Sequence, residues 1–190
     1  MSKQLFRIVA LAGFLGVTSY GADPFTIVSL NPLVTNDNAV SEPAIVGHWH
    51  DFFDVVVRQT GPTEYSVGGA KDDEDGTDVL QMRLTRVKGE LLADLSSKAP
   101  RDSLLLPVHV IVRVCVNSDA LRVAFFVTEW VRDQITRPGG PAHTLIEDRD
   151  LLLTCSTEEL QTFLSRIVKE PQAFGEEGNS RRVTDEEGKQ

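Results

Sequence analysis

Residues 108–127, VHVIVRVCVNSDALRVAFFV, carry the strongest structural pattern in this chain. Valine fills every second position from 108 to 116. Successive side chains of a strand point to opposite faces, so this alternation predicts a β-strand with one apolar face. Asn117-Ser118-Asp119 supplies turn-forming residues, and the apolar alternation resumes at Leu121. The stretch is therefore predicted to form an antiparallel hairpin.

The same period of two continues on both sides of this hairpin. Further strands are predicted over residues 48–57, 64–67, 79–87, 90–95, 143–147 and 150–154. Asp75-Gly76 is a strong hairpin dipeptide, since both positions tolerate a positive φ. About eight short strands without βαβ alternation predict an α+β fold that is predominantly antiparallel β. We expect a strongly curved sheet or a partly open barrel.

A helix near the C-terminus is predicted from signals at both of its ends. Ser156 and Glu159 form a capping box, in which each side chain accepts a hydrogen bond from a free backbone N–H. Pro171 prevents continuation of the helix. The apolar residues at helical spacing are Leu160, Phe163, Leu164, Ile167 and Val168. We expect this helix to pack on the sheet and to close one end of it, and we predict a short helix over residues 130–135.

Residues 1–21 have the three-part plan of a secretory signal peptide. Lys3 and Arg7 precede an apolar run over residues 8–17, and Ser19-Tyr20-Gly21 supplies the small residues of a cleavage site. This run of about ten residues is short of the roughly 20 that span a bilayer as a helix. We expect cleavage after Gly21, export to the periplasm or outside the cell, and no stable membrane insertion afterwards.

The rest of the chain is long enough for one domain with a single core. Residues 22–174 are predicted to form this β-rich domain. Residues 175–190 have almost no apolar side chains and are predicted to be a disordered tail. Arg181-Arg182 is then expected to be a solvated pair within the tail.

The chain is acidic, with 19 Lys and Arg against 28 Asp and Glu and a formal charge of −9. Signal cleavage would remove two of the basic residues. The acidic surface repels nucleic acid and anionic lipid, so neither is expected as a partner.

Cys115 and Cys155 are the two cysteines. In an oxidising compartment an even count permits one disulfide between them. Two separate buried thiols are the alternative.

Several motifs together resemble a family of uncharacterised exported bacterial proteins, many of them predicted lipoproteins. The matching stretches are NPL-x-T at residues 31–35, EPA-x-VG-x-W at 42–49, LLADL at 91–95, Pro107-x-His109 and LLLTCSTEELQTFL at 151–164. The resemblance implies no activity, substrate or cofactor. This chain has no cysteine near the cleavage point that could accept a lipid, which departs from the lipoprotein pattern.

Gly47-x-Trp49 at the start of a strand is also similar to the entry motif of lipocalins. That similarity implies a barrel whose floor is plugged by Trp49 and whose cavity holds a small apolar ligand. Architecture alone does not determine function.

An apolar ligand pocket is one interpretation of the aromatic residues. The candidate lining residues are Trp49, Phe52, Phe53, Phe125, Phe126 and His109. A closed core is the alternative, because a domain of this size needs such side chains in order to fold. For His109 alone, a hydrogen bond to a neighbouring carbonyl or exposure to solvent is the alternative to a role as base or ligand.

Two histidines are weak candidates for a metal site. His48 and His50 lie two residues apart, so a regular strand points both to one face, with Asp54 further along. A transition metal accepts two imidazoles and a carboxylate, but surface histidines without metal are the expected outcome. The acidic turn DDED at residues 72–75 does not fit an EF-hand, since Met82 stands where the bidentate Glu belongs.

The catalytic motifs G-x-S-x-G, H-E-x-x-H and the P-loop do not occur in the sequence. We therefore expect no enzymatic activity and no cofactor. The first hypothesis is a non-catalytic binding or interaction domain that meets another envelope protein through a sheet edge or the acidic face. The alternatives are a lipocalin-like carrier of a small apolar ligand between the sheet and the last helix, and an enzyme of unknown reaction.

Overall fold

The computed structural model describes residues 27–69, 80–97, 108–146 and 150–183. Within these ranges the chain forms one 12-stranded sheet with two α-helices and two 3-10 turns. The expected signal peptide, the DDED turn, the Asp75-Gly76 hairpin and Pro107 lie outside the described residues. No described helix has the length and apolar character needed to cross a membrane.

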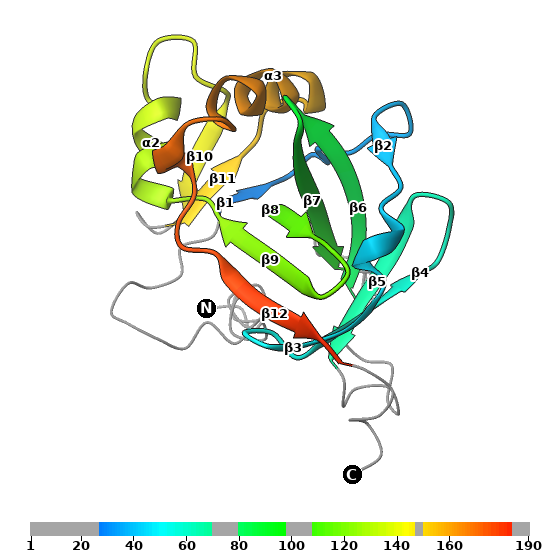
Figure 1. The fold of residues 1–190 in the computed structure, drawn as a ribbon. Coiled ribbons are helices and arrows are strands. Elements are labelled where there is room, and N and C mark those ends of the chain that lie inside the picture. Colours follow the sequence, from blue (N-terminus) through cyan, green and yellow to red (C-terminus); the bar gives the residue numbers. More distant parts are fainter. Residues whose placement is uncertain (1–26, 70–79, 98–107, 147–149, 184–190) are drawn as a thin grey trace.

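Eight strands close into an antiparallel barrel (Figure 1). Seven of them follow one another as a meander: β3 (Gly47–Asp51), β4 (Val55–Gln59), β5 (Glu64–Gly69), β6 (Leu80–Val87), β7 (Glu90–Ser97), β8 (His109–Val116) and β9 (Ala120–Phe125). The predicted hairpin is β8–β9, with Val112 opposite Phe125 and Val116 opposite Leu121. The predicted fold class is confirmed, and the barrel is closed rather than partly open.

The eighth strand comes from the predicted tail. β12 (Gly178–Arg182) lies between β9 and β3 and is antiparallel to both. The prediction of disorder from residue 175 is therefore wrong for this segment, and residues 184–190 lie outside the described part. Backbone hydrogen bonds to two neighbours stabilise β12, and they do not require the apolar side chains on which the prediction relied.

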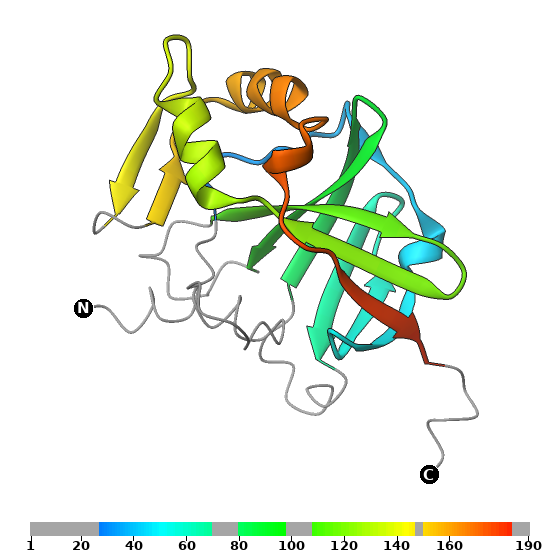
Figure 2. The ribbon, with the colours of Figure 1, turned by 60° about the vertical axis from the view of Figure 1, so that its left-hand side comes forward.

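A small extension continues the sheet beyond β8. β1 (Ile27–Ser29) pairs antiparallel with β8, and β11 (Asp150–Leu153) pairs parallel with β1. β10 (His143–Ile146) pairs with β11 and ends the described sheet. Figure 2 shows β10 and β11 to one side of the barrel, close to the helices. A two-residue strand, β2 (Ala39–Val40), pairs separately with β6.

The molecule has two apolar layers because several strands are apolar on both faces. In β7, Leu91, Ala93 and Leu95 belong to the barrel interior, whereas Leu92 belongs to an outer layer. In β8 the stripe of even-numbered valines is internal and Ile111 is external. Strands buried on both faces lose the simple apolar–polar alternation.

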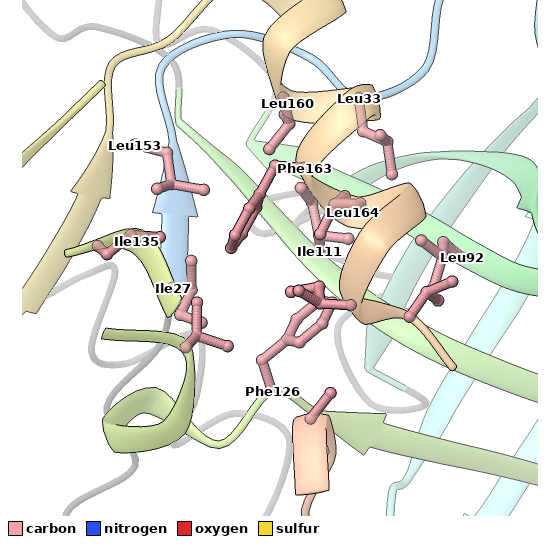
Figure 3. Packing of buried hydrophobic residues seen from close by; sticks show 14 of the residues in the cluster. Ile27, Leu33, Leu92, Ile111, Phe126, Ile135, Leu153, Leu160, Phe163 and Leu164 are labelled. Carbon is pink, nitrogen blue, oxygen red and sulfur yellow. The ribbon is translucent and has the colours of Figure 1, made fainter. Parts of the chain in front are cut away.

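The outer layer is covered by α3 (Thr157–Ile167) and α2 (Thr128–Ile135). The capping box of α3 is present as predicted, with the Ser156 and Glu159 side chains bonded reciprocally to backbone N–H groups. Figure 3 shows Phe163 and Leu164 of α3 in the same apolar cluster as Ile111 of β8 and Phe126, which follows β9. The helix therefore packs against the outer face of the barrel and does not close its end as expected.

Two 3-10 turns complete the described chain. η1 (Pro43–Ile45) leads into β3, and η3 (Pro171–Ala173) follows α3. The second turn brings Phe174 against Phe126, with ring centroids 4.4 Å apart. This contact directs the chain from α3 back to the barrel, where β12 begins.

Candidate functional site

A small apolar cavity of about 50 Å³ lies in the described part of the barrel interior. Its lining includes Phe53, Met82 and Leu121. Sites for small molecules usually measure roughly 300–1,000 Å³. The described interior is therefore packed as a core, and its cavity is too small for a ligand of that class.

The six pocket residues predicted from the sequence do not meet in one site. Trp49 and Phe53 are buried inside the barrel, and only Phe53 lines the cavity. Phe125 packs from the interior side, whereas Phe126 lies in the outer layer. Phe52 is 38% exposed and stacks edge-on against Phe53. The aromatic residues therefore do not line one pocket, and the neighbours Phe125 and Phe126 lie on opposite sides of the barrel wall.

Trp49 lies beneath Arg182, the last residue of β12. The Trp49 indole donates a 2.8 Å hydrogen bond to the carbonyl of Ile45, and the Arg182 guanidinium lies 4.2 Å from its ring centroid. Gly47 has a φ of +151°, and a Cβ there would overlap with Arg182. The Gly47-x-Trp49 motif is therefore explained by packing in this barrel, because the glycine leaves room for the arginine that covers the tryptophan.

His109 forms a partly buried pair with Asp94 on the outer face of the barrel. Nδ1 of His109 lies 2.7 Å from Oδ1 of Asp94, whose side chain is 4% exposed. The second carboxylate oxygen accepts the backbone N–H groups of Leu33 and Val34 at 2.7 and 3.1 Å. His109 thus lies away from the cavity, and its partner is a carboxylate rather than the carbonyl or solvent of the alternative prediction.

The structure shows a second hollow, of about 460 Å³, between α2, α3 and η3. Its lining combines two aromatic rings, Trp130 and Phe163, with two guanidinium groups, Arg137 and Arg166. Arg166 donates a 3.2 Å hydrogen bond to the carbonyl of Gly139 and lies 5.7 Å from the Phe163 ring centroid. We refer to this hollow as the helix groove.

Sequence reasoning missed the helix groove because its residues come from two helices that are far apart in the chain. Trp130 was assigned only to a short helix, and Phe163 to the core face of α3. The available local signal was Arg137, directly before Pro138-Gly139-Gly140-Pro141, and no pattern in the sequence connects it with Arg166.

His48, His50 and Asp54 come together on the outside of the barrel. Asp54 Oδ1 is 2.8 Å from His48 Nε2 and 3.5 Å from His50 Nδ1. The hydrogen bond from His48 lowers the pKa of the Asp54 carboxyl from its ordinary value; burial partly opposes this effect, and His50 adds to it. Among the described residues, these three form a cluster in which one donor atom from each residue lies close enough to the others to share a metal ion.

Both cysteines are free thiols. Cys115 is exposed on β8, where its sulfur accepts a hydrogen bond from Arg122, and Cys155 is buried in the outer layer. Burial raises the pKa of the Cys155 thiol, and the nearby Glu159 carboxylate adds to this effect. The possible disulfide between Cys115 and Cys155 is not formed, and only one of the two thiols is buried.

Comparison with protein-family models, curated proteins and solved structures gives no match to this chain.

Proposed function

We propose that the chain is a non-catalytic binding domain exported to the bacterial envelope, where its helix groove holds a carboxylate-bearing segment of another envelope protein. The observation that carries this proposal is the difference in volume between the barrel cavity and the helix groove. The barrel interior is packed around a cavity of about 50 Å³, whereas the helix groove measures about 460 Å³. Ligand sites are concave and combine apolar walls with a few convergent polar groups.

The chemistry of the groove favours an anionic group next to an apolar one. Arg137 and Arg166 present guanidinium forks, which bind carboxylates through two parallel hydrogen bonds. Trp130 and Phe163 offer ring surface beside them. Glu170 also lines the groove, and its carboxylate repels any further negative charge at that end of the groove.

The negative charge of the whole chain favours a short partner segment over a long acidic one. A formal charge of −9 repels an extended polyanion. Charges more than about 8 Å apart are largely screened at physiological salt, so a short acidic segment responds mainly to the local arginines. One or two carboxylates beside an aromatic side chain fit these conditions.

A lipocalin-like carrier is the second candidate, favoured by the closed barrel and by Trp49 under Arg182. The cavity of about 50 Å³ counts against it, because the described interior has no room for a ligand of several hundred Å³. Native mass spectrometry of protein purified from the envelope separates the two candidates. A retained apolar small molecule supports the carrier and contradicts the groove proposal.

Binding in the groove is tested with a short peptide that carries two glutamates beside a phenylalanine. Trp130 is half-buried at the groove and Trp49 is fully buried in the barrel, so ligand-induced changes in tryptophan emission should come from Trp130. We expect the peptide to change this emission and the same peptide with glutamines to have no effect. Equal responses to both peptides, or none to either, would overturn the groove assignment.

Matched variants connect the peptide result with the natural partner. Arg137→Gln and Arg166→Gln should each weaken peptide binding and reduce recovery of the partner from envelope extract. Arg58→Gln is the control, since it removes the same charge from an exposed position on β4. A partner recovered equally well by all three variants does not use the groove.

Export is tested independently of binding. Mass spectrometry of protein recovered from the periplasm should show an N-terminus near Ala22. Retention of Met1 would contradict signal cleavage.

A further inference from the structure

The β3–β4 hairpin places two histidines and an aspartate on one outward face. Its register pairs His48 with Val56 and Trp49 with Val55. Trp49 and Val55 point into the barrel core, so His48 and His50 point outward. The turn brings Asp54, the residue before β4, back beside them. The pleat of β3 thus places the two histidines, and the turn between β3 and β4 places Asp54.

The distances among the donor atoms are close to those around a bound metal ion. Zinc binds imidazole nitrogen and carboxylate oxygen at about 2.0–2.2 Å, which places neighbouring donor atoms about 3–3.5 Å apart. Asp54 Oδ1 is 2.8 Å from His48 Nε2 and 3.5 Å from His50 Nδ1. One donor atom from each of the three residues lies within 4.8 Å of the other two. An ion therefore needs only small side-chain movements to contact each residue.

The surroundings leave the site accessible. The side chains of His48, His50 and Asp54 are 35%, 49% and 45% exposed. Arg181 of β12 is paired with His50 of the neighbouring strand β3, and its Nε is 3.4 Å from the Asp51 carboxylate. This second carboxylate offsets the guanidinium charge beside the cluster.

We propose that His48, His50 and Asp54 form a surface site for a divalent transition-metal ion of the zinc and copper class. Two imidazoles and one carboxylate are donors that such ions prefer over the oxygen-only sets of calcium and magnesium. Three protein donors on an exposed face leave at least one coordination position to water or to an external ligand. The site rests on the β3–β4 hairpin alone and does not depend on the helix groove.

Calorimetric titration of the untagged protein with Zn²⁺ tests the proposal. We expect one ion per chain at this site, and affinity at least about tenfold weaker in His48→Gln, His50→Gln and Asp54→Asn, since even partners outside the ligand shell cost 10–100-fold. His143→Gln is the matched control, because His143 lies on β10 outside the cluster. Cys115→Ser is the control for zinc binding by the exposed thiol.

Two further measurements distinguish a built site from loss of folding. Circular dichroism and melting without metal should be the same for the three variants and the wild type, since the cluster is exposed. With Cu²⁺, electron paramagnetic resonance should show coupling to two imidazole nitrogens in the wild type and to one in His50→Gln. The proposal is overturned if Zn²⁺ does not bind, if the cluster variants bind it as tightly as the wild type, or if His143→Gln or Cys115→Ser weakens binding to the same extent.

Discussion

The carboxylate of Asp94 joins His109 to the segment that precedes the barrel. Oδ1 lies 2.7 Å from Nδ1 of His109, and Oδ2 accepts the backbone N–H groups of Leu33 and Val34. Both side chains leave the outer faces of neighbouring strands, β7 and β8. A buried carboxylate is tolerated here because it is paired and fully hydrogen-bonded.

Other contacts of the same segment explain why several motifs occur together in this chain. Asn31 Nδ2 donates to the carbonyl of Cys155 at 2.8 Å, and Thr157 Oγ1 donates to the carbonyl of Pro32 at 2.8 Å. NPL-x-T, LLADL, His109 and the start of α3 therefore meet in one hydrogen-bonded layer. In this chain these motifs build the fold, and none of these contacts requires a substrate.

Asp94→Asn should lower the free energy of unfolding by about 3 kcal/mol, because it removes one partner of a buried charged network. The amide places a donor against either the histidine or the two backbone N–H groups. Chemical denaturation of Asp94→Asn, His109→Gln and the double variant measures the coupling. A coupling below about 0.5 kcal/mol would show that the two residues act independently.

Arg182→Lys should destabilise the barrel by about 2 kcal/mol, since lysine cannot reproduce the guanidinium fork. Arg182 donates to the carbonyls of Ser118, Val46 and Ala44 at 2.6, 2.6 and 2.7 Å. Arg181→Lys is the control, because the Arg181–Asp51 pair is exposed and such pairs contribute little. Equal denaturation midpoints for the two variants would contradict the role of Arg182 in sealing the barrel.

Leu164→Ala should cost about 2–5 kcal/mol if α3 is docked on the outer wall, since the truncation leaves a cavity. Leu164 is 2% exposed in the outer layer. Thr162→Ala, on the exposed side of the same helix, should change stability by no more than about 0.5 kcal/mol. An unchanged melting temperature for Leu164→Ala would refute the docking.

Iodoacetamide should modify Cys115 and spare Cys155 in the native protein. Cys115 is exposed, whereas Cys155 is buried and its thiol pKa is raised by that burial, which disfavours the reactive thiolate. Mass spectrometry should find one label under native conditions and two in denaturant. Failure to label either cysteine in denaturant without a reductant would reveal a disulfide and contradict the structure.

The capping box of α3 should make stability depend on pH. The backbone and side-chain hydrogen bonds from Ser156 lower the pKa of Glu159 from its ordinary value. A carboxylate whose pKa is lowered by folding stabilises the native state above the unfolded-state pKa, and this contribution is lost as the pH falls through the folded-state pKa. Glu159→Gln should therefore melt below the wild type at pH 7, and the gap should shrink below about pH 4.5. A gap that does not depend on pH would exclude the carboxylate charge as its cause.

The sequence by itself determined the local elements. The valine alternation over residues 108–127 predicted the β8–β9 hairpin, and Ser156 with Glu159 marked the start of α3. These patterns could be read directly because period two and helix capping involve residues that are neighbours in the chain. The pair of histidines on one face of β3 was recognised for the same reason.

Only the tertiary structure decided how these elements pair and pack against one another. β12 closes the barrel although GNSRR has no apolar pattern, because its pairing partners β3 and β9 lie far away in the sequence. Ile111 and Leu92 turned out to face a second layer, so α3 covers a wall rather than an end. The helix groove likewise unites Trp130 with Arg166 only after both helices have packed. Long-range contacts of this kind depend on packing and chain closure, which a local pattern does not encode.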